Sequence, residues 1–423
     1  MQDTPRPDAR AEGRLAAMSE PRAPRAEAVP EPVRAVLSAL RARGHQSVLV
    51  GGCVRDLLLG ARVADFDAAT AAPPEAVLAL FPRAVPIGLR HGTVMVPTRA
   101  GPLDVTSFRC GPRLEDDLAH RDFTVNAIAW DPHSGALFDP FGGAGDLARR
   151  RLAAVGDARA RFAEDPLRAL RAARLVATLG LAPDPALPAA MAEAREPLRR
   201  VARERLRGEL EALLLAPGAA AGLALLRRTG LEEALAPGVR ADAAAVVGAL
   251  PRELELRLAG WLRGTRTESI LLALRFGQRR SAAVARLVAR HPIDRELPRG
   301  DVDVRRLLRR AGEGDVAALL RLREAELATS AAADAPELQA ARARLEALRA
   351  HIDRVQEAGS LALRRTDLAL DGRAVMDLLG VGPGPLVGEA LRHLGDCAIE
   401  DPSCNTRERL SERLRTWRAA RGA

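Results

Sequence analysis

The first 155 residues carry a pattern of apolar and polar positions that changes between helix and strand several times. Apolar residues at helical spacing are followed by short β-branched runs, which end at glycine or proline turns. Around one Gly-Pro turn the two residue types alternate on both sides, which is typical of a β-hairpin. The predicted elements are a helix over 31–43, a strand over 46–50, a strand over 65–70, a short helix over 74–81 and a hairpin over 91–109.

Beyond residue 155 strand signals nearly vanish. Apolar residues recur at the three- and four-residue spacing of amphipathic helices, with no fixed-period repeat. The pattern therefore predicts an α+β fold, in which a small mixed-sheet head is followed by a long all-helical arm. The predicted helical segments cover 159–180, 188–215, 219–236, 241–263, 268–290, 302–328, 336–359, 372–379 and 406–420.

The net charge favours a polyanionic partner. The chain of 423 residues has 64 basic residues, all of them arginine, against 55 acidic residues, so the formal net charge is +9. The absence of lysine also reflects the bias of a GC-rich coding sequence, so the arginine count alone is weak evidence for function. Aromatic residues make up only 3% of the chain, so aromatic stacking cannot dominate RNA binding. Arginine side chains would have to bind RNA instead, through bidentate hydrogen bonds to phosphates and through stacking of the guanidinium group.

The sequence predicts a cytoplasmic protein. No apolar run approaches the length of about 20 residues that a membrane span needs. Residues 1–33 are rich in proline, arginine, alanine and glutamate and lack an apolar core, so we expect a disordered extension and not a signal peptide. The four cysteines form no CxxC pair, which argues against a disulfide framework or a zinc site.

Three aspartates suggest a metal site. Asp65 and Asp67 are two positions apart, so on a strand their side chains lie on one face and repel each other. Such a pair suits Mg²⁺, which takes oxygen ligands and also binds substrate phosphates. Asp104, on the predicted hairpin, adds a third carboxylate, and three could hold two metals, one at an attacking hydroxyl and one at a leaving phosphate. The alternative is a solvated strand face.

Two further segments suggest nucleotide binding. Gly51 and Gly52 join a strand to a helix, where the backbone can approach a phosphate and Arg55 can donate to it, although an ordinary turn would look the same. Farther along, acidic and basic residues recur every three positions in a helix that we expect to be capped by Asp165, with Pro166 in its first turn. These residues are Asp165, Arg168, Arg171 and Arg174.

The helix that begins near Asp165 can read a base edge. Asp165 can accept a hydrogen bond from an exocyclic amine, and Arg168 can donate one to a ring nitrogen. Cytosine and adenine present this pattern, whereas uracil and guanine present the opposite one and would leave polar groups unpaired. The alternative is a capped helix with a solvated basic face.

Taken together, these motifs resemble the class II tRNA nucleotidyltransferase and bacterial poly(A) polymerase family, and they are most similar to bacterial CCA-adding enzymes. The matching segments occur in the order of the family, and residues 366–391 resemble its C-terminal region. The segments are GGCVRDLLLG (51–60), DFDAAT (65–70), GLRHGTVMV (88–96), LDVTSFR (103–109), DLAHRDFTVNAIA (117–129), LFDPFGG (137–143) and EDPLRALRAAR (164–174).

The resemblance implies attack of a tRNA 3′-hydroxyl on the α-phosphorus of CTP or ATP, with release of pyrophosphate. Asp65 and Asp67 would bind two Mg²⁺ ions, and Asp104 would be the third catalytic carboxylate. Asp165 and Arg168 would select the base. The remaining nucleotide contacts would come from Gly52, Arg55, Arg121, Arg171 and Arg174.

The resemblance also implies a division into domains, while the sequence leaves the oligomeric state open. Residues 34–157 would form the catalytic head, 158–225 a helical neck with the base-reading helix, and 226–423 a helical body and tail that bind tRNA.

The chain departs from the family pattern at three points. Asp104 stands where a glutamate is usual, and His120 stands where a first arginine is usual. The segment 110–121 is shorter than the loop that full CCA-adding relatives carry there, which raises the hypothesis of an enzyme that adds only CC. The alternatives are a poly(A) polymerase of the same family and a non-catalytic arginine-rich RNA-binding protein.

Overall fold

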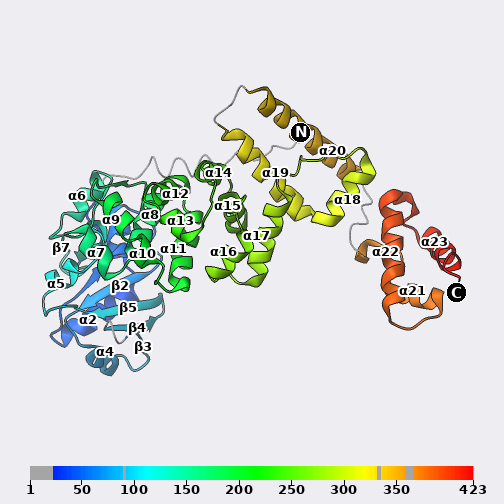
Figure 1. Cartoon of the computed structure of the whole chain (residues 1–423). Coiled ribbons are helices and arrows are strands. Elements are labelled where there is room, and N and C mark those ends of the chain that lie inside the picture. Colours follow the sequence, from blue (N-terminus) through cyan, green and yellow to red (C-terminus); the bar gives the residue numbers. More distant parts are fainter. Residues whose placement is uncertain (1–21, 89–91, 331–334, 359–364, 423) are drawn as a thin grey trace. The chain divides into compact units, whose positions relative to one another are not determined.

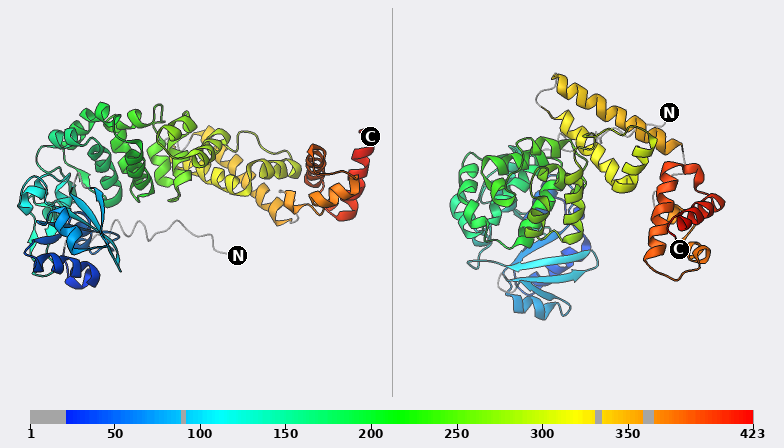
Figure 2. Two further views of the ribbon diagram at one scale, coloured as in Figure 1. Left: turned by 90° about the horizontal axis from the view of Figure 1, so that it is seen from below. Right: turned by 45° about the vertical axis from the view of Figure 1, so that its right-hand side comes forward.

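The computed structural model describes residues 22–88, 92–330, 335–358 and 365–422 (Figure 1). The chain divides into two compact units. The first comprises Met1–Arg257 and Ser269–Gln278, and the second comprises Leu258–Glu268 and Arg279–Ala423. The α+β fold is confirmed, because strands are confined to the N-terminal part of the first unit and helices make up the rest of both units (Figure 2).

A seven-stranded sheet forms the head. Its order is β3-β4-β5-β2-β1-β6-β7, and every neighbouring pair is antiparallel except β2 and β5. The parallel pair places Asp67 beside Asp104. The strands are β1 (Ser47–Val50), β2 (Phe66–Thr70), β3 (Val85–Gly88), β4 (Thr93–Thr98), β5 (Gly101–Ser107), β6 (Ala129–Trp130) and β7 (Leu137–Phe138).

Helices cover the sheet and close its core. α2 and α4 contact each other and the strands β1 to β5, while Leu114 and Leu118 of α5 pack on Val48 and Val50 of β1. The head helices are α2 (Glu31–Ala42), α3 (Gly52–Leu58), α4 (Pro74–Leu80), α5 (Leu114–Ala119) and α6 (Gly143–Ala148), with the 3₁₀ turn η3 (Thr124–Asn126).

The start of the head differs from the prediction for residues 1–33. The expected disordered extension 1–33 reaches too far, because Ala26–Ala28 form the 3₁₀ turn η1 and the side chain of Val29 is buried. Burial of this apolar residue fixes the chain before α2 begins. Residues 1–21 of that extension, and residues 89–91 of the GLRHGTVMV segment, lie outside the described residues.

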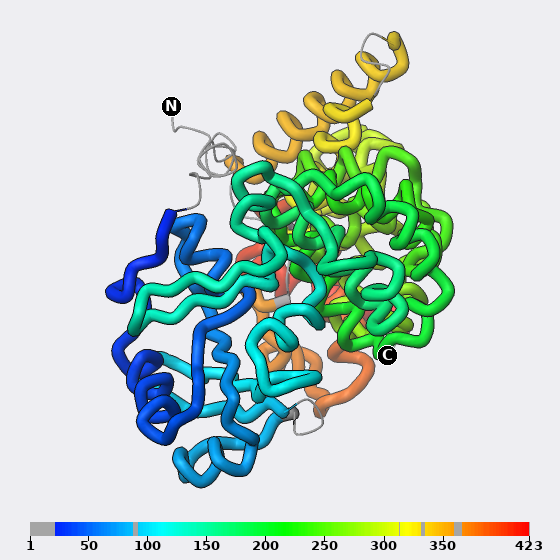
Figure 3. The backbone as a smooth tube through the Cα atoms, turned by 90° about the vertical axis from the view of Figure 1, so that its left-hand side faces the viewer, coloured from blue at the N-terminus to red at the C-terminus, as the bar shows by residue number. Residues whose placement is uncertain are grey.

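The helices that follow the head lie beside its strands (Figure 3), and α8 contacts the short strands β8 (Arg151–Leu152) and β9 (Ala182–Pro183). The expected helix over 159–180 is interrupted at Asp165 and Pro166, because proline at the start of α8 cannot donate to the preceding turn. The segment 188–215 also breaks into three helices. The two-stranded parallel sheet of β8 and β9 went unpredicted. The helices after the head are α7 (Ala158–Glu164), α8 (Leu167–Leu179), α9 (Leu187–Glu193), α10 (Arg195–Leu198), α11 (Arg203–Leu215), α12 (Ala219–Arg228), α13 (Leu231–Leu235), α14 (Ala243–Ala249), α15 (Leu254–Leu262) and α16 (Thr267–Ala273).

Close packing fixes the base-reading helix α8 against its neighbours. α8 contacts both α11 and α12. A Cβ at Gly222 of α12 would lie 2.7 Å from the carbonyl oxygen of Ala173 in α8. Only glycine permits this approach, so α12 holds α8 firmly from one side while α11 contacts it from another.

The second unit is built from helices throughout its described residues. In its C-terminal part, Val375, Leu394, Leu410 and Leu414 are buried in a cluster of their own. Within the described residues, no helix is long and apolar enough to cross a membrane. The helices are α17 (Gln278–Arg290), α18 (Asp301–Ala311), α19 (Glu313–Ala328), α20 (Pro336–Glu357), α21 (Gly372–Leu379), α22 (Pro385–Glu400) and α23 (Arg407–Ala419).

Candidate active site

A cleft of about 590 Å³ in the first unit brings together all but one of the residues that the sequence singled out. The exception is Asp104, which does not line the cleft but pairs in register with Asp67. The predicted residues that line it are Gly52, Arg55, Asp65, Asp67, Arg121, Asp165, Arg168, Arg171 and Arg174.

The three aspartates form one electrostatic group. Asp65 directly precedes β2, so only Asp67 has the strand geometry that was expected of both. Partial desolvation in the cleft raises the pKa of Asp67 to about 6; Arg121 opposes this rise, and the charges of Asp104 and Asp65 add to it. Burial and the charge of Asp65 likewise raise the pKa of Asp104.

This donor set fits a hard divalent cation. Mutual repulsion among carboxylates is relieved when a cation binds between them, and Mg²⁺ is commonly held by one or two carboxylates together with substrate phosphates. Within the described residues, no three acidic, histidine or cysteine side chains surround a common point closely enough to form a complete metal cage. Asp65 and Asp67 would therefore supply part of a coordination shell, with phosphate and water oxygens completing it.

The glycine turn accommodates an arginine. Gly51 has φ +82° and precedes α3, and a Cβ there would lie 2.8 Å from a guanidinium nitrogen of Arg121. The structure thus requires glycine at Gly51 for both its conformation and its contact. Arg55, one turn into α3, donates to the side-chain oxygen of Asn126 at 2.6 Å and to Asp56 at 2.9 Å.

A buried aspartate that the sequence analysis did not single out anchors two arginines of the cleft. Asp117, in α5, is 1% exposed and accepts hydrogen bonds from Arg121 at 3.1 Å and from the Nε of Arg109 at 3.0 Å. It therefore ties together the two ends of the short segment 110–121. Asp117 lies within the DLAHRDFTVNAIA motif, and membership of this motif is the sequence feature that could have pointed to it.

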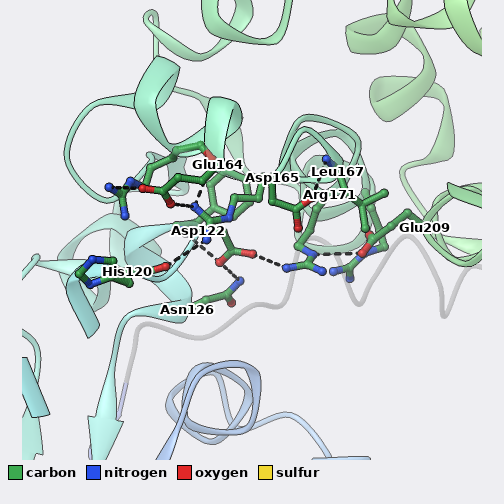
Figure 4. Close-up of polar contacts among 12 residues, drawn as sticks. His120, Asp122, Asn126, Glu164, Asp165, Leu167, Arg171 and Glu209 are labelled. Atoms are coloured by element: carbon green, nitrogen blue, oxygen red, sulfur yellow. Dashed lines mark hydrogen bonds and ion pairs between the residues drawn. The ribbon is translucent and has the colours of Figure 1, made fainter. Parts of the chain in front are cut away.

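A chain of alternating charges fixes Arg171 and Arg174 (Figure 4). Arg171 donates to Asp122 at 2.9 Å and to Glu209 at 3.0 Å, and Glu209 also accepts from Arg174 at 2.5 Å. Burial alone would raise the pKa of Asp122, but the charge and hydrogen bond of Arg171, with hydrogen bonds from Asn126 and the Phe123 N–H, hold it below its usual value. Glu209 comes from α11, far from α8 in sequence, so no local motif revealed it.

Asp165 and Arg168 face the cleft but have separate partners. Arg168 donates to Glu164 at 2.8 Å and to the backbone oxygen of His120 at 3.1 Å. Asp165 accepts from Arg205 of α11 at 2.7 Å and from the N–H of Leu167 at 3.2 Å. Since α8 begins at Leu167 with Pro166 at its N-cap, Asp165 caps the helix only through that one contact.

Comparisons with known proteins identify the family of this chain. The family described as "Poly A polymerase head domain" matches residues 47–153, and that described as "Probable RNA and SrmB- binding site of polymerase A" matches 180–242. The CCA-adding enzyme of Geobacillus stearothermophilus is 32% identical over 417 residues, covering 90% of this chain and 96% of that protein. The chain belongs to the class II CCA-adding enzyme and poly(A) polymerase family. It is a nucleotidyltransferase.

Other relatives extend the comparison within this family. A CC-adding tRNA nucleotidyltransferase of Shouchella clausii is 42% identical over 201 residues, which cover 48% of this chain and 52% of that protein. The crystal structure of the Bacillus stearothermophilus CCA-adding enzyme in complex with CTP has a TM-score of 0.74 at 31% identity, covering 92% of this chain and 98% of that one. A Thermotoga maritima CCA-adding enzyme complexed with tRNA, at 18% identity and a TM-score of 0.66, shares the fold.

Proposed function

We propose that this chain extends the 3′ end of tRNA with cytidine, using CTP, and that it works in the cytoplasm. The observation that supports this most is the shared cleft, which is lined both by Asp65 and Asp67 and by Asp165 and Arg168 at the start of α8. One set of side chains suits phosphoryl chemistry and the other suits recognition of a base edge. Relatives of this family that act on tRNA, and one solved with CTP, support the choice of substrates.

The acidic residues act at the reacting groups. Asp65 and Asp67 would hold Mg²⁺, which when bound polarises the phosphate and lowers the pKa of the attacking hydroxyl. Asp104, whose pKa is raised, is suited to accept the proton of the primer 3′-hydroxyl. The hydroxyl oxygen forms a bond to the α-phosphorus, and pyrophosphate leaves.

The arginines position the nucleotide. Arg55 and Arg121 flank the turn at Gly51, and Arg171 and Arg174 face the same cleft from α8. Guanidinium groups held by fixed carboxylates, as Arg121 is by Asp117, present their remaining N–H groups to phosphate oxygens without losing side-chain entropy on binding.

We infer further that the product is CC and not CCA. The short segment 110–121 contains α5, whose Leu114 and Leu118 lie in the core of the head. Asp117 ties its start to its end through Arg109 and Arg121. A segment anchored in this way has little freedom to reorganise the cleft between cytosine and the larger adenine.

The test uses purified protein and three primers, which are tRNA lacking CCA, tRNA ending in C and tRNA ending in CC. CTP and ATP are offered separately and together with Mg²⁺. We expect addition of two cytidines to the first primer, one to the second and none to the third. Addition of A to the third primer would show CCA synthesis, a long A tail would show a poly(A) polymerase, and no incorporation would indicate a non-catalytic RNA-binding protein.

A further inference from the structure

The head has a second, smaller pocket outside the cleft. Its volume is about 280 Å³, against about 590 Å³ for the cleft, and among the described residues the two share no lining side chain. One wall is a face of α2, and the other is the turn between β6 and β7. The lining residues are Arg34, Leu37, Ser38, Arg41, Pro132 and His133.

This pocket lies at the opposite end of β1 from the glycine turn. Gly51 follows β1 directly and lines the cleft. Antiparallel pairing sets Trp130 of β6 beside Leu49, so the chain after β6 continues toward Ser47, where β1 begins. Arg41 donates to the backbone oxygen of Ser47 at 2.9 Å. The pocket is therefore separate from the cleft.

Both walls of the pocket are held in place by hydrogen bonds. The hydroxyl of Ser47 donates to the backbone oxygen of Leu37 at 2.9 Å, which fixes α2 on β1. Asp131 accepts from the N–H of His133 at 2.8 Å and pairs with Arg41, which joins the turn to α2. A ligand would find its donors already positioned, so binding would cost little ordering entropy.

The pocket carries a positive charge that the protein leaves unneutralised. No acidic side chain lines it among the described residues, and Asp131 pairs with Arg41. Glu31, one turn before Arg34, is exposed and does not line the pocket. Arg34 is half-buried, forms no ion pair or side-chain hydrogen bond with any described residue, and has a buried Nε without an acceptor. Because burial removes part of its hydration, this guanidinium would gain from an anion in the pocket.

The arrangement of donors suits a phosphate group. Arg34, Ser38 and Arg41 are spaced by four and three positions, so they lie on one face of α2. A guanidinium fork matches two oxygens of a phosphate, and His133 adds a donor from the other wall. Donors on two sides fit a tetrahedral oxyanion, whereas a planar carboxylate is satisfied by a single fork.

We propose that this pocket is a second phosphate-binding site, in which Arg34 pairs with the phosphate and Ser38 and His133 donate hydrogen bonds to it. The phosphate is either free inorganic phosphate or part of an RNA backbone. The site is independent of base reading by Asp165 and of the product that the enzyme makes.

The experiment follows the imidazole of His133 by NMR on isotope-labelled, metal-free, full-length protein. Inorganic phosphate is added at constant pH and ionic strength, and the signals that His133→Asn lacks are those of His133. We expect them to shift saturably with phosphate and to stay unchanged with acetate. In Arg34→Gln the dissociation constant for phosphate should rise by about ten-fold or more, because the bidentate ion pair is lost.

Two further variants define the contribution of Arg34. Arg34→Lys keeps the charge without the fork, so its dissociation constant should lie between those of wild type and Arg34→Gln. Arg43→Gln removes the same charge from an exposed position beside α2 that does not line the pocket, and it should bind phosphate as wild type does. Circular dichroism checks that each variant is folded.

Direct binding of tRNA distinguishes the two sources of phosphate. If the pocket holds an RNA backbone, Arg34→Gln should weaken tRNA binding and lower the slope of log K against log salt concentration by about one. If it holds free phosphate, tRNA binding should match that of Arg43→Gln.

Three outcomes of the NMR titration would overturn the site. They are no saturable shift of the His133 signals with phosphate, an equal shift with acetate, and a phosphate response in Arg34→Gln that equals that of wild type.

Discussion

The cleft of the first unit and a charged cluster in the second unit use the same residue types for opposite purposes. In the second unit, Glu326 of α19 accepts from His291 at 2.9 Å and from Arg323 at 2.6 Å, and Arg263 lies 3.4 Å away. Arg323 also pairs with the buried Asp294 at 2.9 Å. Each carboxylate of this cluster is matched by a cation of the same chain.

The difference appears in the pKa values of the acids. Burial would raise the pKa of Glu326, but His291, Arg323 and Arg263 together lower it to about 2. In the cleft, partial desolvation and the neighbouring carboxylates raise the pKa of Asp67 to about 6 in spite of Arg121. A closed ion network stabilises the fold, whereas a group of carboxylates with too few cations favours binding of an external one.

The largest expected effect is the loss of transfer when a cleft carboxylate is removed. Asp65→Ala and Asp67→Ala should each reduce Mg²⁺-dependent incorporation of CTP into tRNA by about a thousand-fold or more, because the metal loses part of its coordination shell. Asp377→Ala, at an exposed position of α21, is the control and should retain full activity. Full incorporation by both cleft variants would refute the metal assignment.

The next effect is on stability in the second unit. Glu326→Gln should lower the free energy of unfolding by about 3 kcal/mol, because it leaves a buried cation without its partner. In the wild type, this contribution is present above the usual pKa of 4.5 and is lost as the pH falls toward about 2. Denaturant titration at neutral pH checks the first point, with the exposed Glu346→Gln as control. An unchanged midpoint would mean that the network contributes nothing net.

The smallest effect has the opposite sign. Asp67→Asn should raise the free energy of unfolding at neutral pH, by less than about 1 kcal/mol because the side chain is open to solvent. The folded state disfavours the ionised form of Asp67, so removing the charge relieves repulsion, and the gain should disappear below about pH 4, where the carboxyl is protonated in both states. Destabilisation at neutral pH would contradict the contrast drawn between the two regions.

The sequence predicted the local elements and many cleft residues, because glycine turns, alternation and acidic pairs are short-range signals. The sequence did not reveal contacts between charged residues that are far apart in the chain. Arg205 and Glu209 lie in an ordinary amphipathic helix, and nothing near them in the chain shows that they hold Asp165, Arg171 and Arg174. The breaks inside the expected helices were missed because apolar spacing continues across them; these helices are 159–180, 188–215, 219–236, 241–263, 268–290 and 302–328.

The sequence by itself determined the fold class, the family motifs and the aspartates that suit a metal, since these depend on residue type and spacing. Only the tertiary structure decided which partner each charged side chain contacts. Asp67 meets Asp104 across a parallel strand pair, Asp117 joins Arg109 to Arg121, and α11 pairs Arg205 with Asp165. The energy of a charge depends on burial and on neighbours within a few ångströms, and both are set by packing between distant parts of the chain.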